Sequence, residues 1–349
     1  MLIKNLKLND YRNYTNYKID FSPKLNIIVG KNGIGKTNIL ESIIVVSNTK
    51  SFRTQHDVDL IKKDKEYLKI EIESDDNKYK VIINKNNKSL YINENLVKRT
   101  SDFIGKLNAI LFKPSDLEIF NESPSERRKI LDIEIGKINN KYLRSLLQYN
   151  SLLKDKNKLL KELNIDKTLL SLIEEAMIPN IKTIIEEREK FINTINEYIN
   201  DYYKKISDTN NNIQVIYKKC SNIENIKENI ISAKDKDYYY HYATFGPHKE
   251  DYLFLVDGYD INSVASQGQR RMILIAFKFA LIKYIQKNAN ITPILLLDDI
   301  LSELDKDNQE RLLKNIPNDM QVIITNTNID NLKIKKDYKL IDLKEEEHV

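Results

Sequence analysis

The chain has 349 residues, of which 41% are hydrophobic and 31% are charged, a composition typical of a folded globular protein and not of a disordered chain. Lys and Arg outnumber Asp and Glu by 56 to 51, a mild basicity that permits nucleic-acid binding without requiring it. A single cysteine, Cys220, excludes an internal disulfide and a cysteine-based metal cluster.

No apolar run reaches the ~20 residues that a membrane span needs. Residues 1–10, MLIKNLKLND, lack the basic, apolar and small-residue regions of a signal peptide. We therefore expect a cytoplasmic protein with no membrane partner.

The N-terminal part of the chain predicts strands around one helix. The pattern alternates or is continuously apolar in residues 2–11, 17–21 and 25–29, and it has helical spacing in residues 36–46. Three further runs read as an antiparallel meander, because they are joined by Asp- and Asn-rich turns. They are residues 67–74, 78–84 and 88–93.

The middle of the chain, from about residue 119 to 235, is charged and helix-periodic. Pro124 stands at a predicted helix start, and Pro179 predicts an interruption. Strands return from residue 238 onward and alternate with helical runs, which predicts a parallel α/β sheet. We predict an α/β domain formed by residues 1–118 and 236–349, with an α-helical domain inserted at residues 119–235.

The stretch GKNGIGKT, Gly30 to Thr37, contains three of the chain's eight glycines. It fits G-x-x-x-x-G-K-[ST] between an apolar strand and a helix, which is the context of a P-loop. Such a loop directs backbone N–H groups at an anion, and the helix N-terminus adds positive charge. The alternative is a chance match in a flexible turn. The predicted nucleotide-binding residues are Gly30, Lys31, Asn32, Gly33, Ile34, Gly35, Lys36, Thr37 and Asn38.

Within this loop, Lys36 is predicted to reach the β and γ phosphates of ATP, and the Thr37 hydroxyl to ligate Mg²⁺. The run ILLLDD supplies a matching acid, because Asp298 ends a strand that is apolar enough for both faces to be buried. We predict that Asp298 is the second Mg²⁺ ligand and that Asp299 orients or deprotonates the attacking water. The alternative is an acidic helix cap after a strand.

The stretch SQGQRR, residues 266–271, precedes a long helical run. Ser266 is placed to cap that helix, and Gly268 leaves backbone N–H groups open to an anion. A second anion-binding site, with no room for it beside the P-loop, suggests that two molecules share each nucleotide. The stretch is similar to the signature of ABC ATPases, in which two subunits enclose two nucleotides. The resemblance implies that Ser266, Gly268 and Gln269 serve the partner's ATP. A simple capped helix is the alternative.

Two further segments bear on the ABC resemblance. Ser302 to Asp305, within ILSELD, resembles the loop that lies across the dimer seam in this class. Thr325 stands where transporters of the class carry a switch histidine, so the sequence departs from transporters there.

The order of segments over nearly the whole chain resembles the RecF family, in the SMC-like branch of ABC ATPases. The motifs that carry the resemblance are DYRNY, NGIGKTNILESI, SFRT, FKPSDL, SPSERRKILD, GPHKED, SQGQRR and LLLDDILSELD. The chain has Lys249 and Glu250 where the family pattern leads us to expect Arg and Asp, which puts a bidentate arginine role in doubt.

The family resemblance implies a homodimer, formed with ATP, that binds duplex DNA near gaps or junctions and acts with RecO and RecR to help RecA load. ATP hydrolysis is then slow and stimulated by DNA. The resemblance places Arg53 at the nucleotide and Asp116 in the lobe-coupling loop. Basic side chains predicted to contact the DNA backbone are Arg127, Arg128, Arg270 and Arg271, with Lys129 beside them.

Three alternatives stay open. Another SMC-type repair ATPase would need longer coiled-coil arms than about 117 residues can form. A transporter's nucleotide-binding subunit would normally have a switch histidine. A small-molecule kinase would leave SQGQRR and SELD without a role.

Overall fold

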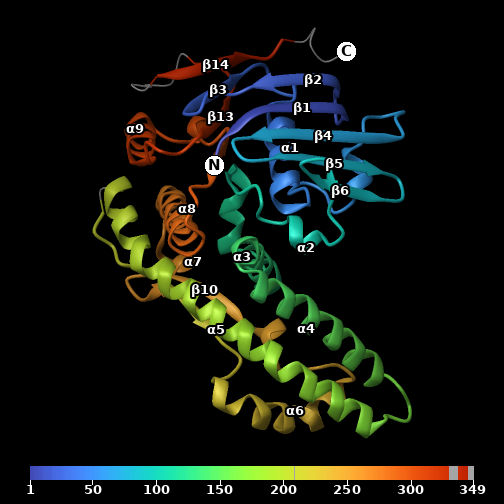
Figure 1. Cartoon of the computed structure of the whole chain (residues 1–349). Helices are drawn as coiled ribbons and strands as arrows, with labels where there is room; N and C mark the ends of the chain where they lie inside the picture. Colours follow the sequence, from blue (N-terminus) through green and yellow to red (C-terminus); the bar gives the residue numbers. More distant parts are fainter. Residues whose placement is uncertain (208, 330–336, 345–349) are drawn as a thin grey trace. The chain divides into compact units, whose positions relative to one another are not determined.

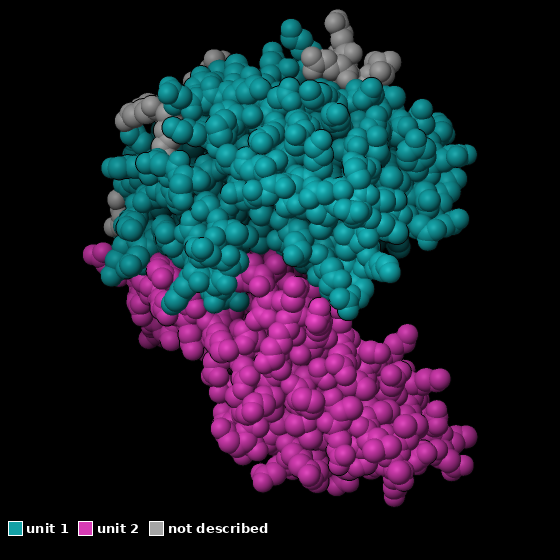
Figure 2. Space-filling view, in the orientation of Figure 1, with its two compact units in different colours: residues 1–116, 201–209, 271–349 teal, residues 117–200, 210–270 magenta. Residues whose placement is uncertain are grey.

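The computed structural model describes residues 1–207, 209–329 and 337–344. The chain divides into two compact units, which Figure 2 colours separately. Unit 1 comprises residues 1–116, 201–209 and 271–349, and unit 2 comprises residues 117–200 and 210–270. Unit 2 therefore extends further toward the C-terminus than the insertion expected at residues 119–235, whose boundaries stay a prediction.

Unit 1 contains a five-stranded sheet in the order β14 (Tyr338–Asp342), β3 (Leu25–Val29), β13 (Val322–Asn326), β12 (Ile294–Asp298) and β8 (Ala109–Phe112). Every neighbouring pair is parallel. Strands β3, β12 and β13 are buried along their whole length, as expected of apolar strands covered on both faces. The predicted parallel α/β sheet is confirmed.

A second sheet of unit 1 has six strands in the order β2 (Tyr14–Asp20), β1 (Ile3–Tyr11), β4 (Tyr67–Ser74), β5 (Lys78–Asn84), β6 (Lys88–Ile92) and β7 (Asn95–Leu96). All of its pairs are antiparallel. Buried and more exposed residues alternate along β4 and β5, because one face of the sheet packs on the core. The predicted meander is therefore confirmed.

Helix α1 (Lys36–Asn48) contacts strands of both sheets, and one core cluster contains residues of β1, α1 and β12. The other helices with residues in unit 1 include α2 (Thr100–Phe103), α8 (Gln267–Ala289) and α9 (Lys306–Asn315). Helix α8 is apolar on nearly every side and is buried through most of its length. Residues 267–270 of this helix belong to unit 2.

Unit 2 contains four long helices that are labelled in Figure 1: α3 (Pro124–Ile138), α4 (Asn140–Leu159), α5 (Lys167–Ile206, whose last residues belong to unit 1) and α6 (Ile226–Tyr240). It also contains the short helix α7 (Ile261–Val264) and a sheet of β11 (Tyr259–Asp260), β10 (Asp251–Val256) and β9 (Ile213–Lys218). Strand β9 lies in the range that we expected to be helical. Its partner β10 is distant in the sequence, so the local pattern did not reveal the pairing.

Pro124 opens α3 as predicted, and the Ser123 side chain caps the helix by accepting from the Glu126 N–H at 3.4 Å. The prediction that Pro179 interrupts a helix is wrong, because α5 continues through it. Residues on both sides of the proline, Met177 and Ile181, are buried, and this packing offsets the missing backbone hydrogen bond.

Candidate nucleotide-binding site

The P-loop joins the end of β3 to the start of α1. Gly35, the residue before the helix, has a φ of 119°, a conformation that L-residues with a side chain rarely adopt. A Cβ at this position would lie 2.6 Å from Tyr14 Oη and 2.8 Å from Asn13 Nδ2. The turn between β1 and β2 therefore lies so close to Gly35 that a side chain at this position would clash with it.

Asn13 and Tyr14 also hold the loop by hydrogen bonds. Asn13 Nδ2 donates to the Ile34 carbonyl at 2.9 Å, and Tyr14 Oη donates to the Gly35 carbonyl at 3.2 Å. Both residues belong to the motif DYRNY. The loop conformation is thus fixed by the neighbouring sheet as well as by its own glycines.

Lys36, the first residue of α1, folds back over the loop. Its Nζ donates to the carbonyl oxygens of Gly30 at 2.6 Å and Lys31 at 3.0 Å. Burial lowers the pKa of this ammonium group, and the carboxylates of Asp299 and Asp298 oppose the shift. The side chain is therefore already aimed across the concave face of the loop.

Thr37 and Asp298 meet although 261 positions separate them: Thr37 Oγ1 donates to Asp298 Oδ1 at 3.0 Å. Thr325 Oγ1 donates to the same oxygen at 2.8 Å, because Asp298 and Thr325 are register partners in the parallel pair β12–β13. Burial raises the pKa of Asp298, and the bonds from Thr325 and Thr37 oppose this increase. The hydroxyl of Thr37 and the carboxylate of Asp298 are hard oxygen donors, which fit Mg²⁺.

Asp299 adopts a left-handed conformation with a φ of 52°. Its backbone N–H donates to Thr325 Oγ1 at 3.1 Å, and its carbonyl accepts from Ser302 Oγ at 2.7 Å. In the described part of the chain its buried Oδ1 has no hydrogen-bond partner. This carboxylate oxygen is therefore open to accept a bond from a bound water molecule.

A polar network that the sequence did not predict supports Asn38 and Arg53. Arg53 Nη1 donates to Asn38 Oδ1 at 2.7 Å, and Asn38 Nδ2 donates to Asn13 Oδ1 at 2.7 Å. The carboxylate of Glu41, fully buried in α1, accepts two bonds from Arg12, at 2.7 and 3.0 Å. The one sequence signal for this network is a glutamate inside the apolar run NILESIIVV.

Ser266 caps α8 as predicted. The Gln269 N–H donates to Ser266 Oγ at 3.2 Å, and the Ser266 N–H donates to Gln269 Oε1 at 2.9 Å. This reciprocal pair is a capping box. Ser266 and Gly268 are exposed, and a Cβ on Gly268 would meet no atom within 4 Å.

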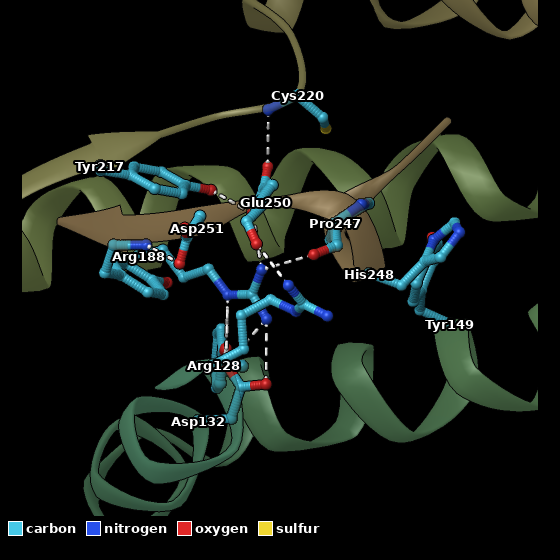
Figure 3. Close-up of polar contacts among 12 residues, drawn as sticks. Arg128, Asp132, Tyr149, Arg188, Tyr217, Cys220, Pro247, His248, Glu250 and Asp251 are labelled. Carbon is cyan, nitrogen blue, oxygen red and sulfur yellow. Dashed lines mark hydrogen bonds and ion pairs between the residues drawn. The ribbon is translucent and has the colours of Figure 1, made fainter. Parts of the chain in front are cut away.

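The two arginines of α3 have intramolecular partners, and Figure 3 labels one of them, Arg128. Arg127 forms a two-bond ion pair with Asp251, at 2.9 and 2.8 Å, and Arg128 donates to the Glu250 carbonyl. Arg270 donates to the carbonyls of Ala265 at 3.2 Å and Asn262 at 3.0 Å. Arg271 is half-buried. DNA contacts by all four arginines stay predictions, and Arg127 has its charge already compensated.

Arg188, which sequence reasoning did not single out, is the centre of the cluster in Figure 3. It is 1% exposed, donates to both Asp132 oxygens at 2.8 and 2.9 Å, and reaches Glu250 Oε2 at 2.5 Å. The Tyr217 hydroxyl and the Cys220 N–H also donate to Glu250. The motif GPHKED therefore places a carboxylate inside the core of unit 2.

Two weaker predictions also have defined positions. Asp116 forms an ion pair with Lys278 of α8, with Asp116 Oδ2 and Lys278 Nζ 2.9 Å apart. Asp305 caps α9 by accepting from the Asn308 N–H at 2.8 Å.

No group of acids, histidines and cysteines with metal-site geometry occurs among residues 1–207, 209–329 and 337–344. Of the described helices, none combines the length and the apolarity that crossing a membrane requires.

The parallel sheet, the glycine loop at the end of β3 and the acid at the end of β12 define a P-loop ATPase head of the ABC/SMC type. The family described as RecF/RecN/SMC N terminal domain matches residues 2–348. The chain is 37% identical to the DNA replication and repair protein RecF of Clostridium acetobutylicum, over 97% of each chain. It is 35% identical to the RecF of Agathobacter rectalis, over 95% of this chain and 93% of that protein.

A solved structure of a recombination mediator protein, RecF with ATP, from the RecFOR pathway, is similar with a TM-score of 0.90 and 30% identity. The alignment covers 98% of this chain and 97% of that one. The Smc head domain of Pyrococcus furiosus shares the fold, with a TM-score of 0.54 at 21% identity over 94% of this chain and 90% of that one. The chain belongs to the RecF family of DNA replication and repair proteins.

Proposed function

We propose that this protein binds ATP with Mg²⁺ and dimerises around the nucleotide on duplex DNA near gaps or junctions. It then acts with RecO and RecR to help RecA loading, in the cytoplasm. The observation that carries this proposal is the 3.0 Å contact of Thr37 with Asp298 beside the P-loop. The solved ATP complex of a RecF protein supports the same choice of nucleotide.

ATP binding uses the backbone N–H groups of residues 30–38, with Lys36 moving its Nζ from the loop carbonyls to the β and γ phosphates. Thr37 and Asp298 hold the metal ion, which supplies charge neutralisation to the phosphates. Arg53 contacts the nucleotide from its position beside Asn38. Because the Lys36 ammonium is already oriented by Gly30 and Lys31, it loses little conformational freedom on binding.

Hydrolysis uses Asp299 as the residue that orients and deprotonates water. Its unpartnered Oδ1 supports this role. Lys36, Asp298 and Asp299 form the catalytic set of one subunit, and Ser266 and Gly268 complete it from the other. Turnover is slow and stimulated by DNA, so that hydrolysis acts as a switch for release.

Dimerisation uses the start of α8. Ser266 and Gly268 are exposed, the capping box with Gln269 keeps the helix N-terminus ordered, and the site beside Gly268 is free of side chains. A phosphate from the partner's ATP fits such an N-terminus, because its N–H groups point outward and carry partial positive charge.

DNA binding depends on the phosphate charge and the shape of the DNA and not on its base sequence. Arg270 and Arg271 lie next to the proposed dimer site, and Arg128 lies on α3 of the inserted helical domain, proposed as residues 119–235. Arg127 is the weakest of the four, because Asp251 compensates its charge.

Analytical ultracentrifugation with and without Mg²⁺–ATP tests the proposal. We expect a monomer without nucleotide, a dimer with it, and ATP hydrolysis that increases when duplex DNA is added. Ser266→Arg is expected to block the dimer and leave ATP binding to the monomer intact. A dimer that forms equally well without nucleotide contradicts ATP-driven dimerisation, and hydrolysis that ignores DNA contradicts the proposed DNA-stimulated switch.

A further inference from the structure

Three tyrosines at the end of α6 are exposed and in contact with one another. Tyr239, Tyr240 and Tyr242 have 77%, 52% and 42% of their surface exposed. The rings of Tyr239 and Tyr240 meet edge to face at 5.0 Å, and those of Tyr240 and Tyr242 lie 5.8 Å apart. We call these three residues the tyrosine platform.

The backbone beneath the platform is fixed in place. His241 Nδ1 lies 3.0 Å from the Leu160 carbonyl, and the Ala243 N–H donates to Asn157 Oδ1 at 2.7 Å. The Thr244 N–H and hydroxyl both donate to Asp237 Oδ1, at 2.7 and 2.6 Å. The tyrosines are therefore held on an ordered support, so that a ligand would meet them with little further loss of conformational freedom.

The surroundings of the platform carry free positive charge. Lys249 Nζ lies over the Tyr242 ring, 4.8 Å from its centroid. Lys158 and Lys161 flank Leu160, to which His241 is bound, and Lys236 is one turn before Tyr240. Within the described chain none of these four exposed lysines forms an ion pair, and the exposed acids within four residues of them in the sequence are Asp155, Glu162 and Asp235.

We propose that the tyrosine platform stacks the unpaired bases of single-stranded DNA. Exposed aromatic rings offer π faces to bases, and adjacent cations attract the phosphates between them. Fully paired duplex DNA keeps its base faces inside the helix, so it cannot use the rings. The platform rests on the proposed function and adds the element that distinguishes a gap or a single-stranded tail from an uninterrupted duplex.

Anisotropy of labelled DNA tests the platform. The variant Tyr239→Ala/Tyr240→Ala/Tyr242→Ala is compared with the matched variant carrying Phe at the same positions. The probes are a duplex with an oligo(dT) tail, the same duplex with an abasic tail, and the blunt duplex, each with Mg²⁺–ATP. We expect the alanine variant to lose tenfold or more in affinity for the oligo(dT) tail, because three stacked bases are lost.

The phenylalanine variant keeps the rings and is expected to bind the oligo(dT) tail like the wild type. Neither variant changes the affinity for the blunt duplex or for the abasic tail. Lys249→Gln is expected to reduce the slope of log K against log salt on the tailed DNA by about 0.7. Melting temperatures within a degree of the wild type show that the exposed substitutions leave the fold intact.

Equal binding of the oligo(dT) tail by the alanine variant and the wild type overturns the platform. A wild type that binds the tail through the tyrosines but ignores the blunt duplex and ATP retains the platform and overturns the proposed function. A wild type that binds none of the probes overturns both.

Discussion

Thr37 Oγ1 and Asp298 Oδ1 are 3.0 Å apart, so the first turn of α1 is hydrogen-bonded to the end of β12. The contact exists because β3, which leads into the P-loop, and β12 are separated by the single strand β13. Both strands end at the same edge of the parallel sheet. Ligand sites of open parallel sheets lie at this edge, outside the carboxyl ends of the strands.

Asp298→Asn is expected to stabilise the protein without nucleotide. Burial raises the pKa of Asp298 in the folded state. The stability that this carboxyl contributes is therefore fully present below its unfolded pKa and is lost as the pH rises through its folded pKa. Asparagine retains an oxygen for Thr37 and Thr325 and does not ionise. Calorimetry at pH 7 should show a Tm higher by about a few degrees.

That difference in Tm is expected to shrink as the pH falls toward about 4, where an ordinary carboxyl begins to protonate. Adding Mg²⁺–ATP should reverse the order, because the amide is a poorer ligand for Mg²⁺ than the carboxylate. A difference in Tm that does not depend on pH would show that ionisation of Asp298 is not its cause.

Lys36→Met is expected to weaken ATP binding by about 100-fold, because two charge-assisted hydrogen bonds to phosphate are lost. Isothermal titration calorimetry measures the affinity. The melting temperature without nucleotide should stay close to that of the wild type, since within the described chain the hydrogen bonds of Lys36 Nζ go to two loop carbonyls. Unchanged affinity would remove Lys36 from the phosphate site.

Asp299→Asn is expected to keep ATP binding and reduce hydrolysis by at least about 100-fold, the upper part of the range for a general base. The ATP-bound dimer should then persist in sedimentation for longer than that of the wild type. The matched variant is Asp307→Asn, which changes an exposed acid of α9 that lies outside the P-loop and outside the segment Ser302 to Asp305. Normal turnover by Asp299→Asn would assign the base to another residue.

Gly35→Ala is expected to destabilise unit 1 by about 2 to 3 kcal/mol, which combines left-handed strain with a steric clash. The new Cβ would lie 2.6 Å from Tyr14 Oη. Gly33→Ala is the control, because Gly33 also has a positive φ of 83° but faces open space. Its cost should be limited to the strain, about 1 kcal/mol. Urea unfolding measures both.

Arg188→Met is expected to cost about 3 to 5 kcal/mol, because it leaves Asp132 and Glu250 without their buried partner. Lys129→Met is the control on the neighbouring helix: its ion pair with Glu126 is half-exposed and should contribute less than about 1 kcal/mol. Chemical unfolding followed by circular dichroism separates the two. If Arg188→Met lowers the free energy of unfolding as little as Lys129→Met does, the cluster around Arg188 does not stabilise unit 2.

Local sequence patterns were enough to predict several elements of the fold. The period of two in residues 67–84 predicts β4 and β5, Ser123 and Pro124 mark the start of α3, and Gly30 to Thr37 predicts a strand, a loop and a helix. Each of these depends on interactions between residues close in the chain, such as caps, turns and the alternation of side chains, and sequence patterns record such interactions directly.

Contacts between distant residues became visible in the three-dimensional fold and not in the sequence. The register of β12 against β13 places Thr325 beside Asp298, and the β1–β2 turn brings Tyr14 to Gly35. Asp251 forms an ion pair with Arg127, whose contact with DNA stays a prediction. Strand β9 and the passage of α5 through Pro179 also depend on remote partners. Sheet pairing, ion pairing and burial bring together residues that are far apart in the chain, and they override local propensity when enough surface is buried.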